Sequence, residues 1–189
     1  EIYPHESLVE SKGFVPTEIA QDIKQKCINL GFYACNFPEN IGGAGLNHLD
    51  FALVERELGR GSMALTHFFG RPQNILMACK DEQIEKYLLP AVRGELMDAL
   101  AMTEPDAGSD VRGMKCFAKS EGNDWIVNGT KHFISGAEHA DFVIVFIATG
   151  EEKTEKGPKK KITAFLVDRG TPGFVIRDGY NSVSHKGYK

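Results

Sequence analysis

The chain has 189 residues, of which 42% are hydrophobic and 25% are charged, and its formal net charge is −4. This composition is typical of a soluble globular protein, and the length allows one large domain or two small ones. The slight negative charge argues against nucleic acid as a partner, and the longest nearly apolar run, 142–148, is far too short for a membrane span.

The first half of the chain carries helical patterns. Apolar residues recur at helical spacing over 16–30, after Pro16 and before Gly31, and predict a helix there. The Asn, Pro and Gly residues of 32–46 predict a loop. Further helical segments are expected over 47–58, 62–69, 73–79 and from Asp81 to about residue 94.

Past Thr103 the pattern changes to short β-rich runs separated by turn-forming residues. Strands are predicted over 114–120, 125–127, 131–135, 142–149, 162–167 and 174–176. Asn128-Gly129 is the strongest short hairpin signal, the only tryptophan, Trp125, is expected in the core, and the charged residues 150–161 predict a long exposed loop. Helices followed by strands indicate an α+β fold.

The residues that commonly bind metals show no ligand spacing. The cysteines at 27, 35, 79 and 116 contain no C-x-x-C pair and predict buried free thiols. His67, His132 and His139 are likewise spaced unlike metal ligands. No metal site is expected.

An apolar run, 96–103, leads into Glu104-Pro-Asp-Ala-Gly-Ser-Asp110. A loop of this composition can present N–H groups and hydroxyls to a phosphate or to the polar edge of a planar cofactor. The three carboxylates and the lack of a G-K-[ST] sequence argue against a nucleotide P-loop. From the residues alone the alternative stays open that this is a tight connection in which Ser109 and Asp110 bind backbone N–H groups.

The segment AMTEPDAGSD, 101–110, resembles the flavin-binding motif T-E-P-x-A-G-S-D of the acyl-CoA dehydrogenases. Asn128-Gly-Thr-Lys131 followed by Phe133-Ile-Ser135 is similar to the family's N-G-x-K-x-[WF]-I-[TS] segment. Residues 37–45, 55–59 and 81–88 look like segments of the family's helical domain. The matches occur in the family's order over nearly the whole chain, so coincidence is implausible.

The resemblance implies an N-terminal all-α helical domain over 1–98 and an antiparallel β-barrel-like middle domain over 99–189, cut short before a C-terminal helical bundle. It implies flavin-dependent α,β-dehydrogenation of an acyl-CoA thioester to a trans-2-enoyl-CoA. The family's catalytic glutamate would lie C-terminal to Lys189, so no catalytic residue is assigned and the isolated chain is expected to be inactive. Alternatives are an oxidase or monooxygenase of the same fold, or a non-catalytic binding module.

The resemblance also implies a set of FAD contacts. Thr103 would hydrogen-bond the isoalloxazine, Ser109 would touch substrate or pyrophosphate, and the Ser135 hydroxyl would face the N5 edge. Phe133 and Ser135 stand where the family commonly has Trp and Thr. The full implied set is Leu100, Met102, Thr103, Gly108, Ser109, Phe133, Ile134 and Ser135.

The implied partners are an acyl-CoA substrate, an electron-transfer flavoprotein and further copies of the chain in a dimer or tetramer. The implied location is the bacterial cytoplasm or, in a eukaryote, the mitochondrial matrix.

Overall fold

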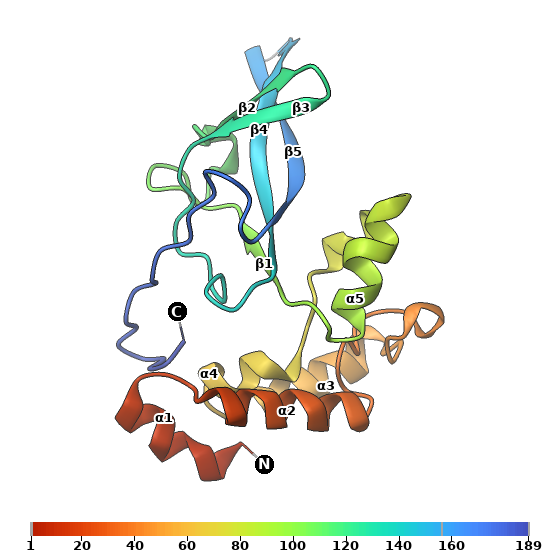
Figure 1. The fold of residues 1–189 in the computed structure, drawn as a ribbon, viewed down its shortest axis with the longest axis vertical. Helices are drawn as coiled ribbons and strands as arrows, with labels where there is room; N and C mark the ends of the chain where they lie inside the picture. Colours follow the sequence, from red (N-terminus) through yellow and green to blue (C-terminus); the bar gives the residue numbers. More distant parts are fainter. Residues whose placement is uncertain (1, 156, 189) are drawn as a thin grey trace. The chain divides into compact units, whose positions relative to one another are not determined.

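The computed structural model describes residues 2–155 and 157–188 (Figure 1). It divides into two compact units, one made of Glu1–Met97 with Tyr180–Lys189 and the other of Asp98–Gly179. Lys156, within the predicted loop 150–161, and Lys189, the predicted boundary, lie outside the described residues.

The first unit is helical. The predicted helices over 16–30 and 47–58 are confirmed, whereas the one over 73–79 is a 3₁₀ helix and α1 was not predicted. The loop over 32–46 is confirmed apart from one 3₁₀ turn. The α-helices are α1 (Glu6–Lys12), α2 (Thr17–Asn29), α3 (His48–Leu58), α4 (Met63–Thr66) and α5 (Leu89–Val92). A 3₁₀ turn at Tyr3–His5 precedes α1, and between the α-helices lie 3₁₀ turns at Glu39–Ile41, His67–Phe69 and Asn74–Ala78 and a π-helical turn at Ile84–Leu88.

Helix α3 begins at a side-chain cap. The side-chain oxygen Oδ1 of Asn47 accepts hydrogen bonds from the backbone N–H groups of Leu49 at 2.9 Å and Asp50 at 3.0 Å. These bonds satisfy donors that the first turn of a helix leaves without a partner. The cap is important here because α3 has no buried residue among those described, with Leu49 70% exposed.

We expect Asn47→Ala to lower the free energy of unfolding by about 1 kcal/mol, because both capping bonds are lost. Asn47→Asp, which keeps an acceptor, should cost much less. Urea unfolding of the three proteins measures the difference. Equal stability of Asn47→Ala and the parent chain would show that the cap contributes nothing.

The cysteines of this unit fit the prediction of buried free thiols only in part. All four cysteines of the chain are free, and Cys27 and Cys35 are buried here, as Cys116 is in the second unit. Cys79 is only half-buried. No helix among the described residues has the length and apolar character needed to cross a membrane.

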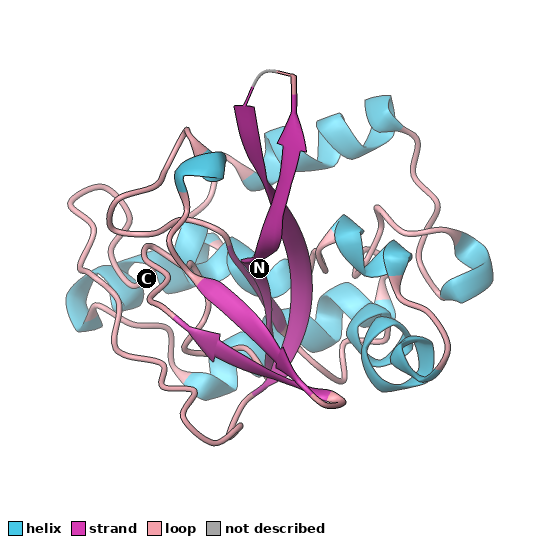
Figure 2. Cartoon of the chain, turned by 90° about the horizontal axis from the view of Figure 1, so that it is seen from above, coloured by secondary structure: helices cyan, strands magenta, loops and turns pink. Residues whose placement is uncertain are grey.

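The described part of the second unit contains a five-stranded sheet, seen from above in Figure 2. Strand β4 is central. Strand β1 pairs parallel with its first four residues, β2 pairs parallel with it at Phe117 and Ala148, and β5 is antiparallel to it, while β3 pairs antiparallel with β2. Helices followed by strands are therefore confirmed, but the sheet is mixed rather than wholly antiparallel. The long connection from β1 to β4 permits the parallel pairing. The strands are β1 (Asp98–Ala101), β2 (Phe117–Glu121), β3 (Asp124–Asn128), β4 (Phe142–Thr154) and β5 (Gly157–Asp168).

Several strand predictions need correction. Strand β1 was not predicted, and residues 131–135 and 174–176 are not strands. Strands β4 and β5 continue through most of the predicted loop over 150–161 as a paired ribbon. The β2–β3 turn is formed by 122–123, so Asn128-Gly129 is not the hairpin turn. Trp125 is 44% exposed because β3 pairs only with β2.

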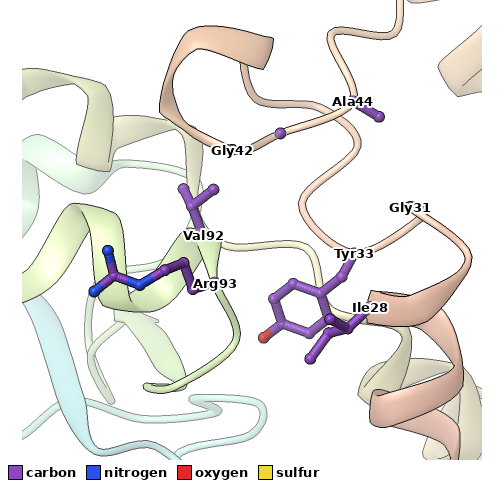
Figure 3. Close-up of a pocket in the computed structure, with 8 residues that line it drawn as sticks. Ile28, Gly31, Tyr33, Gly42, Ala44, Val92 and Arg93 are labelled. Carbon is purple, nitrogen blue, oxygen red and sulfur yellow. The ribbon is translucent and has the colours of Figure 1, made fainter.

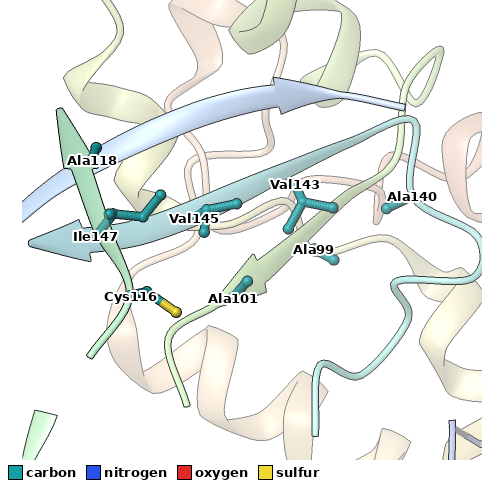
Figure 4. Packing of buried hydrophobic residues seen from close by; sticks show 8 residues of the cluster. All are labelled: Ala99, Ala101, Cys116, Ala118, Ala140, Val143, Val145 and Ile147. Atoms are coloured by element: carbon teal, nitrogen blue, oxygen red, sulfur yellow. The ribbon is translucent and has the colours of Figure 1, made fainter. Parts of the chain in front are cut away.

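A small apolar core holds β1, β2 and β4 together (Figure 4). Val143, Val145 and Ile147 alternate along β4 and pack with Ala99 and Ala101 of β1. The alanines let the strands lie close with little side-chain entropy to lose. This packing fixes the end of β1, from which the predicted flavin-binding segment begins.

Candidate functional site

The segment 102–110 follows β1 directly and folds as a compact loop. The backbones of Glu104 and Ala107 exchange hydrogen bonds of 2.8 and 3.2 Å, which close the tight turn through Pro105. Asp110 accepts a hydrogen bond of 3.2 Å from the Arg112 N–H and starts the turn Val111–Gly113. The local role considered for Asp110 is therefore confirmed.

The second predicted segment lies beside the first. The His132 N–H donates to the Thr103 carbonyl at 2.8 Å, and the Lys131 ammonium donates to the Met102 carbonyl at 2.9 Å. Two stretches about thirty residues apart in the sequence are thus joined at the end of β1. Met102 and Thr103 are thus bonded to the two residues that precede the stretch 133–135, and that stretch is a loop and not the predicted strand.

Phe133 has an unusual backbone conformation within this loop. Its φ is +56°, in the left-handed region that a bulky residue adopts only under constraint. The ring is 69% exposed and stacks on His132 with centroids 4.0 Å apart. A strained backbone with an exposed flat ring is a feature often associated with binding sites.

The other end of the loop is also anchored. Arg169, just after β5, donates 2.7 Å hydrogen bonds to the carbonyls of Ala137 and Ala140. These bonds hold the turn that follows Ser135. The stretch 131–140 is therefore fixed by basic side chains near both ends, without strand pairing.

Beneath the two segments lies a buried ion pair. Lys131 Nζ is 2.8 Å from Glu104 Oε1, and the two side chains are only 9% and 3% exposed. The carboxylate also accepts from the backbone N–H of Cys116 at 3.1 and 3.2 Å, and from that of Lys115. Sequence reasoning treated Glu104 as a motif position and missed this contact, because nothing in the linear pattern pairs it with Lys131.

Burial alone would raise the pKa of Glu104, but the hydrogen bonds from Lys131, Cys116 and Lys115 outweigh it and lower the pKa to about 2. Burial raises the pKa of the Cys116 thiol to about 11, with the Glu104 carboxylate acting in the same direction. Glu104 is therefore a fixed anion and Cys116 a neutral thiol at neutral pH. Neither has the pKa expected of a proton-transfer group or nucleophile.

Three hydroxyl groups among the predicted FAD contacts suit a planar cofactor with polar edges. Among the described residues, the hydroxyls of Thr103, Ser109 and Ser135 have no hydrogen-bond partner within the chain. Ser109 thus does not bind a backbone N–H, unlike in the alternative considered from the sequence. No group of three or more His, Cys, Asp or Glu able to hold a metal occurs in the described part.

Cavities occur in both units of the described chain. One of about 360 Å³ in the first unit is lined by Tyr33, Val92 and the 42–44 loop (Figure 3), and the guanidinium of its Arg93 is paired with Glu95 at 2.7 Å. The second, about 170 Å³, lies against Glu104 and Gly129. Neither cavity is lined by any predicted FAD contact. Of those contacts, Gly108, Ser109, Phe133 and Ser135 are exposed and the other four are half-buried.

Residues 1–95 match the N-terminal domain and residues 99–189 the middle domain of the acyl-CoA dehydrogenases. The chain belongs to the acyl-CoA dehydrogenase family. The resemblance noted from the motifs is therefore confirmed.

Relatives within the acyl-CoA dehydrogenase family carry several activities in their names. The 3-(aryl)acrylate reductase of Clostridium sporogenes is 36% identical over 92% of this chain. The mitochondrial isovaleryl-CoA dehydrogenase of Pongo abelii is 39% identical over 84%. The CarC subunit of the caffeyl-CoA reductase–Etf complex of Acetobacterium woodii is 34% identical over 87%. The chain spans 45%, 38% and 43% of these three proteins.

Solved structures of acyl-CoA dehydrogenases have a similar fold. The glutaryl-CoA dehydrogenase of Mycobacterium smegmatis in complex with FADH2 is 28% identical, with a TM-score of 0.78 over 98% of this chain and 46% of that one. The butyryl-CoA dehydrogenase of Megasphaera elsdenii is 29% identical, with a TM-score of 0.79 over 98% of this chain and 49% of that one.

Proposed function

We propose that this chain provides the FAD- and substrate-binding part of an enzyme that dehydrogenates an acyl-CoA thioester to a trans-2-enoyl-CoA. The observation that carries the proposal is the hydrogen-bonded contact of Met102 and Thr103 with Lys131 and His132, the two residues that lead into the 133–135 loop. Membership of the family and the similarity to an FADH2-bound dehydrogenase support it. We propose residues 1–98 as a helical domain and 99–189 as the flavin-binding domain.

Each predicted contact has a physical role in this proposal. The Thr103 and Ser135 hydroxyls hydrogen-bond the polar edge of the isoalloxazine, and the exposed Phe133 ring covers part of its flat face. Ser109 contacts the substrate or the pyrophosphate. Bound FAD supplies the two-electron oxidation, while the protein orients it against the substrate. The remaining proposed contacts are Leu100, Met102, Gly108 and Ile134.

We assign the general base to no residue of the chain. The reaction needs a carboxylate that accepts the α-proton of the thioester, and such a group works best with a pKa near the operating pH. The low pKa of Glu104 and its buried ion pair make it unsuitable. We propose that the base lies C-terminal to Lys189 and that residues 1–189 alone are inactive.

We propose an electron-transfer flavoprotein as the electron acceptor. The CarC relative is named as a subunit of a caffeyl-CoA reductase–Etf complex, which supports this choice. Further copies of the chain, as a dimer or tetramer, are proposed to complete the enclosure of FAD.

Removal of the two hydroxyls should weaken FAD binding. In the full-length protein we expect Thr103→Val and Ser135→Ala each to raise the Kd for FAD about two- to tenfold, because a neutral hydrogen bond contributes about 0.5–1.5 kcal/mol. Titration of the apoprotein with FAD, followed by flavin fluorescence, measures the change. Thr163→Val, which removes a β5 hydroxyl paired with Thr149, is the control and should bind FAD like the parent protein. Parent-like affinity and flavin spectra in both site variants would refute the assignment.

A second candidate is the reverse reaction, reduction of an enoyl thioester. Two of the relatives are named as reductases, which favours considering it. Anaerobic bleaching of the flavin by acyl-CoAs supports dehydrogenation. Reoxidation of chemically reduced flavin by 2-enoyl-CoAs, without bleaching by acyl-CoAs, supports reduction. Rapid reaction of reduced flavin with oxygen would instead favour an oxidase or monooxygenase.

A further inference from the structure

The buried ion pair of Glu104 and Lys131 contacts three separate segments of the second unit. Lys131 Nζ reaches both Glu104 Oε1 at 2.8 Å and the Met102 carbonyl at 2.9 Å. Glu104 in turn accepts from the N–H groups of Lys115 and Cys116, which lead into β2. One ammonium and one carboxylate therefore link the 102–104 loop, the start of β2 and the segment that precedes Phe133.

These contacts include one proposed flavin contact, Met102, and lie one residue away from another, Thr103. Thr103 stands between Met102 and Glu104, and its own carbonyl accepts the His132 N–H at 2.8 Å. Phe133 follows His132 directly and has the left-handed φ of +56°. The position of the Phe133 backbone is thus set by the two residues before it, both bonded to the 102–104 loop.

Burial makes this link costly to alter. A buried ammonium without its carboxylate is strongly unfavourable, and so is a buried carboxylate without its ammonium. The two side chains therefore remain in contact. The carboxylate has no direct role in proton transfer, since Lys131 and the two backbone N–H groups already bind it.

We propose that Glu104 and Lys131 are positioning residues, which hold the two flavin-contacting segments, 102–103 and 133–135, at the spacing that FAD binding requires. This inference rests on the proposed function, because it needs those segments to contact FAD. The pair itself touches neither cofactor nor substrate in the proposal. The pair positions the flavin-contacting segments through the bond of Lys131 to the Met102 carbonyl and through the neighbouring bond of the His132 N–H to the Thr103 carbonyl.

The test uses Lys131→Met, Glu104→Gln and the double variant in the full-length protein. Each single variant should raise the Kd for FAD about tenfold or more, as expected for the loss of charge-assisted hydrogen bonds. The double variant removes both charges, so its unfolding midpoint should recover towards that of the parent. Its FAD affinity should stay low, because the bond to the Met102 carbonyl is still missing.

A purely structural pair would behave differently, since FAD affinity would then recover together with stability in the double variant. That result, or parent-like FAD affinity in both single variants, would overturn the proposal. The exposed pair Lys115–Asp106, at 2.7 Å on the same loop, is the matched control. Lys115→Met and Asp106→Asn should change FAD affinity by less than about twofold, since exposed ion pairs contribute little.

Amide hydrogen exchange in the absence of FAD separates this inference from the proposed function. The His132 amide should exchange faster in Lys131→Met than in the parent, because the contact that holds it near the Thr103 carbonyl is weakened. If the parent bound no FAD, the proposed function would fail, while faster exchange would still support the link between the segments. Unchanged exchange at His132 in Lys131→Met would overturn the proposal that the ion pair holds the two segments together.

Discussion

Gly129→Ala is expected to destabilise the chain by about 3 kcal/mol or more. A Cβ added at Gly129 would lie 2.2 Å from the Cys116 sulfur, 2.7 Å from its Cβ and 2.8 Å from its Cα. The backbone φ of +140° at Gly129 is also one that residues with a Cβ rarely adopt. The strand ends that carry Cys116 and Gly129 would have to separate, which disturbs Lys131 two residues later. Chemical unfolding followed by tryptophan fluorescence measures the loss.

Two controls separate the clash from the backbone strain. Gly122→Ala also has a positive φ, +62°, but its new Cβ meets nothing within 4 Å, so it should cost only about 1 kcal/mol. The double variant Cys116→Ala, Gly129→Ala removes the sulfur but leaves the contacts with Cβ and Cα, so only partial recovery is expected. If Gly129→Ala were no less stable than Gly122→Ala, close packing at Gly129 would be refuted.

The same glycine explains a wrong prediction from the sequence. Asn128-Gly129 has the composition of a two-residue hairpin turn, yet the β2–β3 turn is at 122–123. Glycine is needed at 129 because the backbone passes against Cys116, which is thirteen residues away in sequence. Local turn propensity cannot distinguish a tight turn from a close approach between strands.

The long helices and the change from helix to strand were predictable because they depend on local periodicity. The mixed pairing of the sheet was not, since β1 pairs parallel with β4 through residues that are 44 positions apart in sequence, such as Asp98 and Phe142. The extension of β4 and β5 through charged residues was also missed. There the residues face solvent on a paired ribbon, with Lys159 next to Glu152 at 3.4 Å, so charge did not indicate a loop.

The candidate site, too, could be predicted in part from local sequence and in part could not. Its two segments could be named from their motifs, and the structure joins them through His132 and Thr103. Their shape could not be predicted, because the stretch 131–140 is held near its ends by Lys131 and Arg169 rather than by strand pairing. Such long-range bonds from single side chains leave no periodic pattern in the sequence.

Glu104 should make the stability of the chain strongly dependent on pH in the acid range. Its pKa is about 2 in the folded chain against an ordinary value of 4.5, so the folded state binds this proton more weakly than the unfolded state does. The stabilisation is fully present above about pH 4.5 and is lost as the pH falls towards about 2. A difference of this size corresponds to about 3 kcal/mol at neutral pH.

Comparison with Glu104→Gln isolates this contribution from those of other carboxylates, such as Glu95, whose pKa is lowered by its hydrogen bond with Arg93. We expect the variant to be less stable than the parent by about 3 kcal/mol at neutral pH and by less than about 2 kcal/mol near pH 3. Urea unfolding at several pH values measures this gap, the difference in the free energy of unfolding between the variant and the parent. Asp106→Asn, which removes the exposed carboxylate beside Lys115, should show only a small gap at neutral pH. A gap for Glu104→Gln that stayed constant from neutral pH to about pH 3 would mean that Glu104 is not held as a buried anion, because only a carboxylate that is charged in the folded chain loses its advantage on protonation.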